Sequence, residues 1–144
     1  MDTPIERDNR CFCCGKDNER GLHLSIAYPE KGHAETSLEV PLWCAGWREL
    51  THGGFLSMIL DEVMAHACVA LERTAVTAEM TTRFLKPVAT GSRIRAMAKV
   101  EESRGRILKT RGWIYDTDGN VAAEGSARFL GMGAPGDDTR APVP

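Results

Sequence analysis

The residues with the clearest chemical potential lie in one apolar segment, "THGGFLSMILDEVMAHA", at residues 51–67. Gly53 and Gly54 stand where a helix is expected to begin, so they supply backbone N–H groups without intrahelical partners and the positive end of a helix dipole. Because they have no side chains, a carbonyl group can approach these donors closely. Asp61 follows two turns later, in a setting where a carboxylate is rare unless it has a partner or a task. The segment therefore combines an acid with an anion-stabilising helix start.

A second acid stands beside the first, and the spacing favours different roles for the two. Glu62 lies four residues before His66, which predicts an ion pair at the surface or a solvated side chain. Asp61 instead lies in a stripe of small residues, with Ser57 four positions before it and Ala65 four positions after it. This stripe favours Asp61 as the functional carboxylate.

The elements around this segment predict an α+β domain. Residues from Gly53 to about Arg73 lack Pro, are rich in good helix formers and are apolar on a very broad side, which predicts one long helix. Residues 22–28 and 34–40 alternate apolar and polar side chains and are expected to form a hairpin. Four strands in an antiparallel meander are expected after the helix, at residues 76–87, 92–102, 106–116 and 121–130. A helix this apolar needs a curved sheet wrapped around it. Because one sheet cannot cover the helix completely, we expect a second copy to cover the rest in a homodimer.

The first strand after the helix has a two-residue alternation that predicts which face is buried. Val76, Ala78, Met80, Thr82 and Phe84 are expected to face the core, with Thr77 on the opposite face.

Length and composition predict one domain and do not indicate a nucleic-acid partner. The chain has 144 residues, 42% of them hydrophobic, and a net charge of −2, which gives no general basic field for nucleic acid. No segment approaches the roughly 20 apolar residues that span a bilayer, and the charged N-terminus is unlike a secretory signal, so we expect a cytoplasmic protein without a membrane partner. The expected organisation is an N-terminal segment (1–19), the main domain (20–131) and a flexible tail (132–144).

The N-terminal segment contains an unusual cysteine motif. Cys11 and Cys14, followed by Gly15, form a C-x-x-C-G sequence within a compact loop at residues 11–21, here named the Cys loop. Such a motif is the corner of many zinc sites, but a structural zinc ion needs four ligands. The possible completions are Cys13, His23, His33 and Cys44, none at a recognised spacing. A packed thiol loop is the simpler interpretation, so no metal ligand is assigned. An odd number of cysteines, five, in a reducing compartment argues against a disulfide framework.

The sequence "HGGFLSMILDE" resembles the helix signature of hotdog-fold acyl-CoA thioesterases, in the branch of the phenylacetate-degradation and 4-hydroxybenzoyl-CoA thioesterases. The element order over residues 20–131 and the strand end "FLKPVATG" are similar too. "CFCCGKDNERGLHL" and "GWRELTHGG" resemble the N-terminal motif of a subgroup that begins with C-x-x-C-G.

The resemblance implies an enzyme whose site is shared between two protomers. Asp61 would act as general base or nucleophile and would face His52, Gly53 and Gly54 of the partner in a homodimer or dimer of dimers. His52 would contribute mainly through the backbone after it. Thr77 matches a hydroxyl position that orients water in some relatives. Where some relatives carry Asn or Gln six residues before the histidine, this chain has Gly46, so that carbonyl contact must come from elsewhere or be absent.

An acyl-CoA substrate implies local cations for its phosphates and no separate cofactor. The turns at Lys86–Gly91 and Arg104–Arg106 are the preferred basic patches. Trp47 is expected to cover the acyl end or to anchor its loop. The predicted substrate-binding residues are Arg83, Lys86, Pro87, Arg104, Arg106 and Trp47.

Two other functions stay open. A hotdog hydratase or dehydratase usually has a Gly-Asp-x-Asn-Pro type motif, which this sequence lacks. The other alternative is a non-catalytic acyl-CoA binder or zinc-organised module. The acyl group, aromatic or fatty, is not defined by the sequence.

Overall fold

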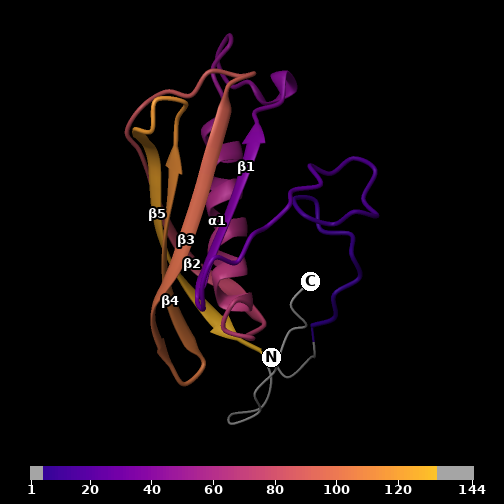
Figure 1. Ribbon diagram of the computed structural model, residues 1–144, viewed down its shortest axis with the longest axis vertical. Helices are drawn as coiled ribbons and strands as arrows, with labels where there is room; N and C mark the ends of the chain where they lie inside the picture. The colour runs from indigo at the N-terminus through magenta and orange to yellow at the C-terminus, as the bar shows by residue number, and fades with distance from the viewer. Residues whose placement is uncertain (1–4, 133–144) are drawn as a thin grey trace.

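The long helix and the sheet that covers it are arranged as the sequence predicts. In the computed structural model, which describes residues 5–132, one helix, α1 (Gly53–Val69), lies against a curved five-stranded antiparallel sheet (Figure 1). The strands are β1 (His33–Glu39), β2 (Ala75–Phe84), β3 (Arg93–Arg104), β4 (Ile107–Tyr115) and β5 (Val121–Gly131), and a short 3₁₀ helix, η1 (Leu42–Cys44), precedes α1. The expected α+β architecture, a curved sheet around one central helix, is confirmed.

The helix is held by burial on most of its sides. It packs against all five strands, and full burial of one aliphatic side chain contributes about 1.5–3 kcal/mol. It ends at Val69, four residues before the predicted end, and Glu72 then adopts a positive φ of 58° as the chain turns toward β2. The side chains of α1 with no exposed area are Ile59, Leu60, Val63, Met64, Ala67 and Cys68.

The sheet has the order β1-β3-β4-β5-β2, so its two edges are β1 and β2. The meander is correct for β3, β4 and β5, which pair in sequence. It is wrong for β2, which pairs with β5 at the far side instead of with β3. The chain after β2 therefore crosses to the opposite side of the sheet, and β2 is left with one free edge.

The predicted hairpin before the helix is wrong. Residues 22–28 form no strand; the bridge between Ala27 and Glu35 and the hydrogen bond from the Thr36 hydroxyl to the Ser25 carbonyl join them to β1. His23 has a positive φ of 50°, which breaks the extended path. The N–H groups of Leu22 and Leu24 bond instead to carbonyl groups of the Cys loop, at 2.9 and 2.8 Å. The loop therefore takes the donors that a hairpin would have used.

A β-bulge changes the expected faces of β2. Thr77 is opposite the buried Phe129, whereas Glu79 is opposite the exposed Arg128, with the register shift between Thr77 and Glu79. Such a shift reverses the side on which the preceding residues project. Thr77 therefore faces the helix, not the outer face as predicted, and Ala78 is exposed.

Three further predictions from the sequence concern disulfides, membrane-spanning helices and the C-terminal tail. All five cysteines are free. Within residues 5–132, no helix has the length and apolar character needed to cross a membrane. The predicted flexible tail falls outside the described residues from position 133 onward.

Candidate functional site

Among the described residues, the start of α1 presents one backbone donor without an acceptor. His52 is the N-cap, and its Nδ1 accepts a hydrogen bond from the N–H of Gly54 at 2.8 Å. The His52 carbonyl accepts from Phe55 and Leu56, at 3.0 and 3.3 Å. No acceptor for the N–H of Gly53 is found among residues 5–132. Of the two glycines that the sequence singles out, Gly53 therefore keeps a free N–H, whereas Gly54 donates to the capping imidazole.

The surface around this donor is concave and combines polar and apolar groups. Gly46, Trp47, Thr51, His52 and Gly53 line a hollow of about 420 Å³. Trp47 is 83% exposed. The ring of Phe84, from the end of β2, lies 3.4 Å from where a Cβ at Gly53 would be. Gly46 fits closely, since a Cβ there would come within 3.2 Å of the His52 Cα, and it offers no side-chain donor.

The second catalytic candidate is a carboxylate held by a hydroxyl. The Oγ1 of Thr77 on β2 donates a hydrogen bond to Oδ1 of Asp61 on α1 at 2.5 Å. Asp61 is half-buried. The bulge in β2 makes this contact possible, because it turns Thr77 toward the helix. The structure thus brings together two residues that the sequence predicted separately.

The acid and the free donor do not meet within one chain. Asp61 is eight residues after Gly53 on the same unbroken helix, so the two lie about 12 Å apart along the axis. His52, Gly53 and Trp47 are at the start of α1, whereas Asp61 and Thr77 are near its middle. A reaction that uses both groups needs the donor from a second copy.

The predicted phosphate-binding residues lie at opposite ends of the sheet. Arg83, Lys86 and Pro87 are near the start of α1, where the N–H of Thr51 bonds to Val88. Arg83 pairs with Glu124 at 3.2 Å, and Lys86 pairs with Asp116 at 3.9 Å.

Arg104 and Arg106 flank the turn between β3 and β4 at the other end, where Arg73 contacts the carbonyl group of Gly105. Through the strand pairing, Arg83 is level with Trp113 and Lys86 lies near the level of Tyr115, so Arg106 is about 23–30 Å away along β4. One chain therefore does not combine them in one patch.

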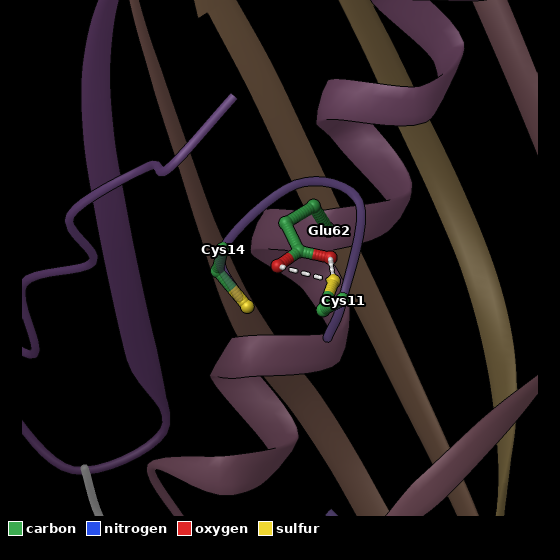
Figure 2. Close-up of side chains that lie close together, drawn as sticks. All are labelled: Cys11, Cys14 and Glu62. Atoms are coloured by element: carbon green, nitrogen blue, oxygen red, sulfur yellow. Dashed lines mark hydrogen bonds between the residues drawn. The ribbon is translucent and has the colours of Figure 1, made fainter. Parts of the chain in front are cut away.

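A second cluster of reactive side chains forms where the Cys loop crosses α1. Figure 2 shows Cys11 and Cys14 facing Glu62. The Sγ of Cys11 lies 3.7 Å from both carboxylate oxygens of Glu62. The Nε2 of His66 lies 3.1 Å from Oε1 of Glu62 and 3.4 Å from Sγ of Cys14. The Glu62–His66 pair is real, but it is not at the surface as predicted, because the Cys loop covers it and leaves the two side chains 12% and 5% exposed.

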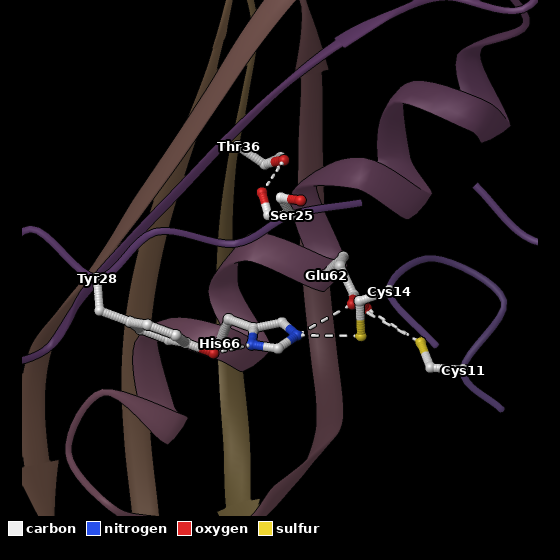
Figure 3. Close-up of polar contacts among 7 residues, drawn as sticks. All are labelled: Cys11, Cys14, Ser25, Tyr28, Thr36, Glu62 and His66. Carbon is white, nitrogen blue, oxygen red and sulfur yellow. Dashed lines mark hydrogen bonds and ion pairs between the residues drawn. The ribbon is translucent and has the colours of Figure 1, made fainter. Parts of the chain in front are cut away.

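The other nitrogen of His66 is also engaged. Its Nδ1 lies 2.6 Å from the hydroxyl of Tyr28, which completes a chain of contacts from Tyr28 to the two thiols (Figure 3). Burial raises the pKa of the Cys14 thiol above its usual value, and the hydrogen bond and charge of Glu62 add to this effect. Burial acts to raise the pKa of Glu62, but hydrogen bonds from His66 and Cys14 outweigh it, so that this pKa is lowered.

The partners of the C-x-x-C motif differ from those considered from the sequence. Cys13 and Cys44 are buried in the core, His23 contacts the carbonyl group of Asn18, and His33 pairs with Glu30. Glu62 and His66 take their place. Their spacing of four on a helix is a signal for a shared face, but the sequence does not show that a loop about 50 residues away lies across it.

The family is shown by comparison of the sequence with known families. A family model described as the thioesterase superfamily matches residues 49–123, just over half of the chain. A search of curated proteins found no match.

Several solved structures have the same fold as this chain. The PaaI protein of the Escherichia coli phenylacetic acid degradation operon is 23% identical, with a TM-score of 0.74 over 79% of this chain and 83% of that chain. The protein smu.793 of Streptococcus mutans, bound to acetyl CoA, is 16% identical, with a TM-score of 0.73 over 78% of this chain and 90% of that chain.

A hypothetical thioesterase of Streptococcus pneumoniae, solved with coenzyme A, is 15% identical, with a TM-score of 0.73 over 78% of this chain and 88% of that chain. Structures of its variants replace an aspartate, and a threonine sixteen positions later, by alanine. By its sequence match and its fold, the present chain belongs to the thioesterase superfamily and has the hotdog fold.

Proposed function

We propose that this protein is an acyl-CoA thioesterase in which Asp61 of one protomer and Gly53 of another act on the same thioester. The contact between Asp61 and Thr77 carries this proposal. It joins an acid on the central helix to a hydroxyl on the neighbouring strand at 2.5 Å. The two residues are sixteen positions apart, the same spacing as the aspartate and threonine replaced in the Streptococcus pneumoniae protein.

The chemistry requires an activated attacking group and a donor for the oxyanion. As a general base, Asp61 takes a proton from water, and the water oxygen attacks the thioester carbonyl. The negative charge that develops on the carbonyl oxygen is stabilised by the Gly53 N–H and the helix dipole. The C–S bond then breaks, and the coenzyme A thiolate leaves and takes up a proton.

A nucleophilic Asp61 gives the same products by a different route. Its carboxylate attacks the carbonyl carbon, the thiolate leaves, and water hydrolyses the resulting mixed anhydride. In both routes Thr77 occupies Oδ1 and leaves Oδ2 for the reaction. Thr77 is thus a positioning residue.

A second protomer supplies what one chain lacks. The distance of about 12 Å along α1 is too long for Asp61 to share a carbonyl group with its own Gly53. The free edge of β2 and the exposed side chains Leu42, Trp43 and Trp47 provide surface for a partner. We therefore expect a homodimer, or a dimer of dimers, as the active form.

The substrate is an aromatic or fatty acyl-CoA. The hollow of about 420 Å³ beside Gly53 falls in the range of roughly 300–1,000 Å³ of small-molecule sites, and Trp47 and Phe84 lie beside it for contact with an acyl group. Arg83 and Lys86 lie at the same end and are the first candidates for the phosphates. The likeness to PaaI supports the phenylacetate-degradation branch.

Hydrolysis of a panel of aryl- and fatty acyl-CoAs tests the proposal, with a thiol-detecting dye as readout. We expect turnover of at least one member, and Asp61→Ala is expected to lower kcat by about 10²–10⁴-fold. Absence of turnover above the Asp61→Ala level on every substrate would remove the proposal.

A non-catalytic acyl-CoA binder is the second candidate. The features that favour it are the missing side-chain donor at Gly46 and the use of the Gly54 N–H by His52. Calorimetry that finds binding of a non-hydrolysable acyl-CoA analogue, with no turnover of the matching substrate, would support this alternative.

A further inference from the structure

The N-terminal part of the described chain has little regular structure to hold it in place. Between residues 5 and 32 there is no helix or strand, yet the Cys loop lies against α1. Its turn is tight, because the Gly15 N–H bonds to the Cys11 carbonyl at 2.9 Å and a Cβ at Gly15 would come within 2.4 Å of the Cys11 nitrogen. Only glycine fits this turn, which presents Cys11 and Cys14 to the same face of α1.

Four donor groups of the right chemistry converge at this point. We propose that Cys11, Cys14, Glu62 and His66 bind one zinc ion, which fastens the Cys loop to the central helix. The ligand atoms of Cys11, Cys14 and Glu62 all lie within 4.8 Å of one another, and Nε2 of His66 is within 3.4 Å of two of these residues.

The distances suit a tetrahedral site. Zinc bonds of about 2.3 Å to sulfur and about 2.0–2.1 Å to nitrogen or oxygen place neighbouring ligand atoms about 3.3–3.8 Å apart. The observed separations are 3.7 Å for Cys11 and Glu62, 3.4 Å for Cys14 and His66, and 3.1 Å for Glu62 and His66. These are three of the six separations in the cluster. Cys11 and His66 lie at opposite ends of it (Figure 3), so these two side chains must move closer together to close the site around an ion.

The surroundings of His66 fit the role of a zinc ligand. A ligating imidazole usually donates its other N–H to a fixed acceptor, which sets the tautomer and the ring orientation. The Tyr28 hydroxyl, 2.6 Å from Nδ1, is placed to be such an acceptor, and a zinc ion would replace the hydrogen bond from Nε2 to Glu62 so that the Nε2 lone pair binds the metal. The Arg7 side chain also interacts with the Tyr28 hydroxyl.

Donor type, charge and access favour zinc and a structural role. Two thiols and an imidazole suit zinc better than magnesium or calcium, which prefer oxygen ligands. The cation also offsets the charge of a carboxylate that is only 12% exposed. A hollow of about 960 Å³ bordered by Cys14, Ser25 and His66 gives an entry path. With four protein ligands no coordination position is open for substrate, so the ion stabilises the fold and does not catalyse.

The adjacent acids thereby acquire separate tasks, with Asp61 facing β2 and Glu62 facing the Cys loop. The zinc proposal does not depend on the proposed hydrolysis, because it uses none of the residues assigned to that reaction.

Metal analysis of the full chain tests the site directly. After expression with added zinc and removal of free metal by gel filtration, we expect about one zinc per chain by elemental mass spectrometry. Cys11→Ser, Cys14→Ser and Glu62→Gln should each lose most of this zinc. Cys44→Ser is the matched control, since Cys44 is a buried cysteine outside the cluster, and it should keep the wild-type content. Circular dichroism checks that each variant is folded.

Cobalt provides a spectroscopic readout that does not depend on activity. Addition of Co²⁺ to the chelator-treated full chain should give the ligand-field bands of tetrahedral cobalt and a thiolate charge-transfer band, which Cys14→Ser weakens. Tyr28→Phe should keep the stoichiometry and weaken metal binding by about 10–100-fold.

Three results would overturn the proposal. The first is folded wild-type protein without zinc and without cobalt bands. The second is a disulfide between Cys11 and Cys14 in protein purified under reducing conditions. The third is a Glu62→Gln variant that keeps full zinc content, because it would remove Glu62 from the ligand set.

Discussion

At the scale of single residues, two neighbouring acids on one helix serve different partners. Successive side chains on an α-helix point about 100° apart, so Asp61 reaches Thr77 on β2 while Glu62 reaches the Cys loop. The sequence identified Asp61 from its stripe of small neighbours, and it identified the Glu62–His66 pair from spacing. It did not predict that Cys11 and Cys14 cover this pair, because that contact joins segments about 50 residues apart and depends on a loop without periodic pattern.

The hydrogen bond from Thr77 can be tested by its removal. Thr77→Val keeps the branched shape of the side chain but loses the donor to Asp61. We expect kcat to fall by about 10–100-fold, the equivalent of one hydrogen bond to a charged group, with little change in KM. Thr77→Ser keeps the hydroxyl and should retain most of the activity. Wild-type kcat in Thr77→Val would show that Thr77 does not position the acid.

At the scale of elements, the helix fits closely against the sheet because two strands carry glycine where they face it. Gly112 of β4 is opposite Gly125 of β5. A Cβ at Gly112 would lie 3.2 Å from the Met64 side chain, and one at Gly125 would lie 3.4 Å from it. The pair therefore determines how near α1 can approach.

Filling this space should destabilise the protein. Gly112→Val introduces atoms into the contact with Met64 and Leu60, and we expect the free energy of unfolding to fall by about 1–3 kcal/mol. Urea unfolding followed by circular dichroism measures this change. The control is Ser126→Ala on the exposed face of β5, which should stay within about 0.5 kcal/mol of wild type. Equal stability of Gly112→Val and wild type would contradict the close fit.

A buried thiol on the same helix should make stability depend on alkaline pH. Burial raises the pKa of Cys68 from 9.0 to about 12. The folded state therefore holds this proton more tightly than the unfolded state, so the contribution to stability is complete below pH 9 and is lost as the pH rises toward 12. Between pH 9 and 11 the free energy of unfolding should fall more steeply in wild type than in Cys68→Ala. Parallel slopes would show that Cys68 titrates normally.

The elements were predicted well where one residue pattern controls them. The helix and the last four strands lie close to their expected positions because burial on α1 and on β3, β4 and β5 follows the apolar period. The prediction of a hairpin was wrong because His23 leaves the extended region and because carbonyl groups of the Cys loop accept the hydrogen bonds of the Leu22 and Leu24 N–H groups. The predicted side of β2 on which Thr77 projects was wrong, because the alternation of apolar and polar residues does not reveal a single-residue bulge.

At the scale of the whole molecule, the proposed active site is shared between two chains. The acid near the middle of α1 and the free N–H at its start are about 12 Å apart in one protomer. Exposed tryptophans near the helix start and the open edge of β2 give a partner its contact surface. Dimerisation is thus a condition of activity in this account.

Two variants remove the two proposed halves of the site, the acid and the backbone donor, one at a time. Asp61→Ala removes the acid. Gly53→Pro removes the N–H with little backbone strain, because Pro is favoured at the first helical position and His52, with φ −61° and ψ 132°, already has the backbone conformation that precedes proline. It should lower kcat by about 10²–10³-fold. Gly53→Ala keeps the N–H and places a Cβ at an ordinary 3.4 Å from Phe84, so it serves as control.

The most direct measurement is the activity of mixed dimers. Asp61→Ala and Gly53→Pro chains, each strongly impaired alone and each with a different affinity tag, are expressed together, and dimers that carry both tags are purified. One of the two sites in each mixed dimer then combines an intact Asp61 with an intact Gly53 from the other chain. We expect these dimers to have about half of the wild-type activity. Mixed dimers no more active than either parent variant would contradict a site shared between Asp61 and the partner's Gly53.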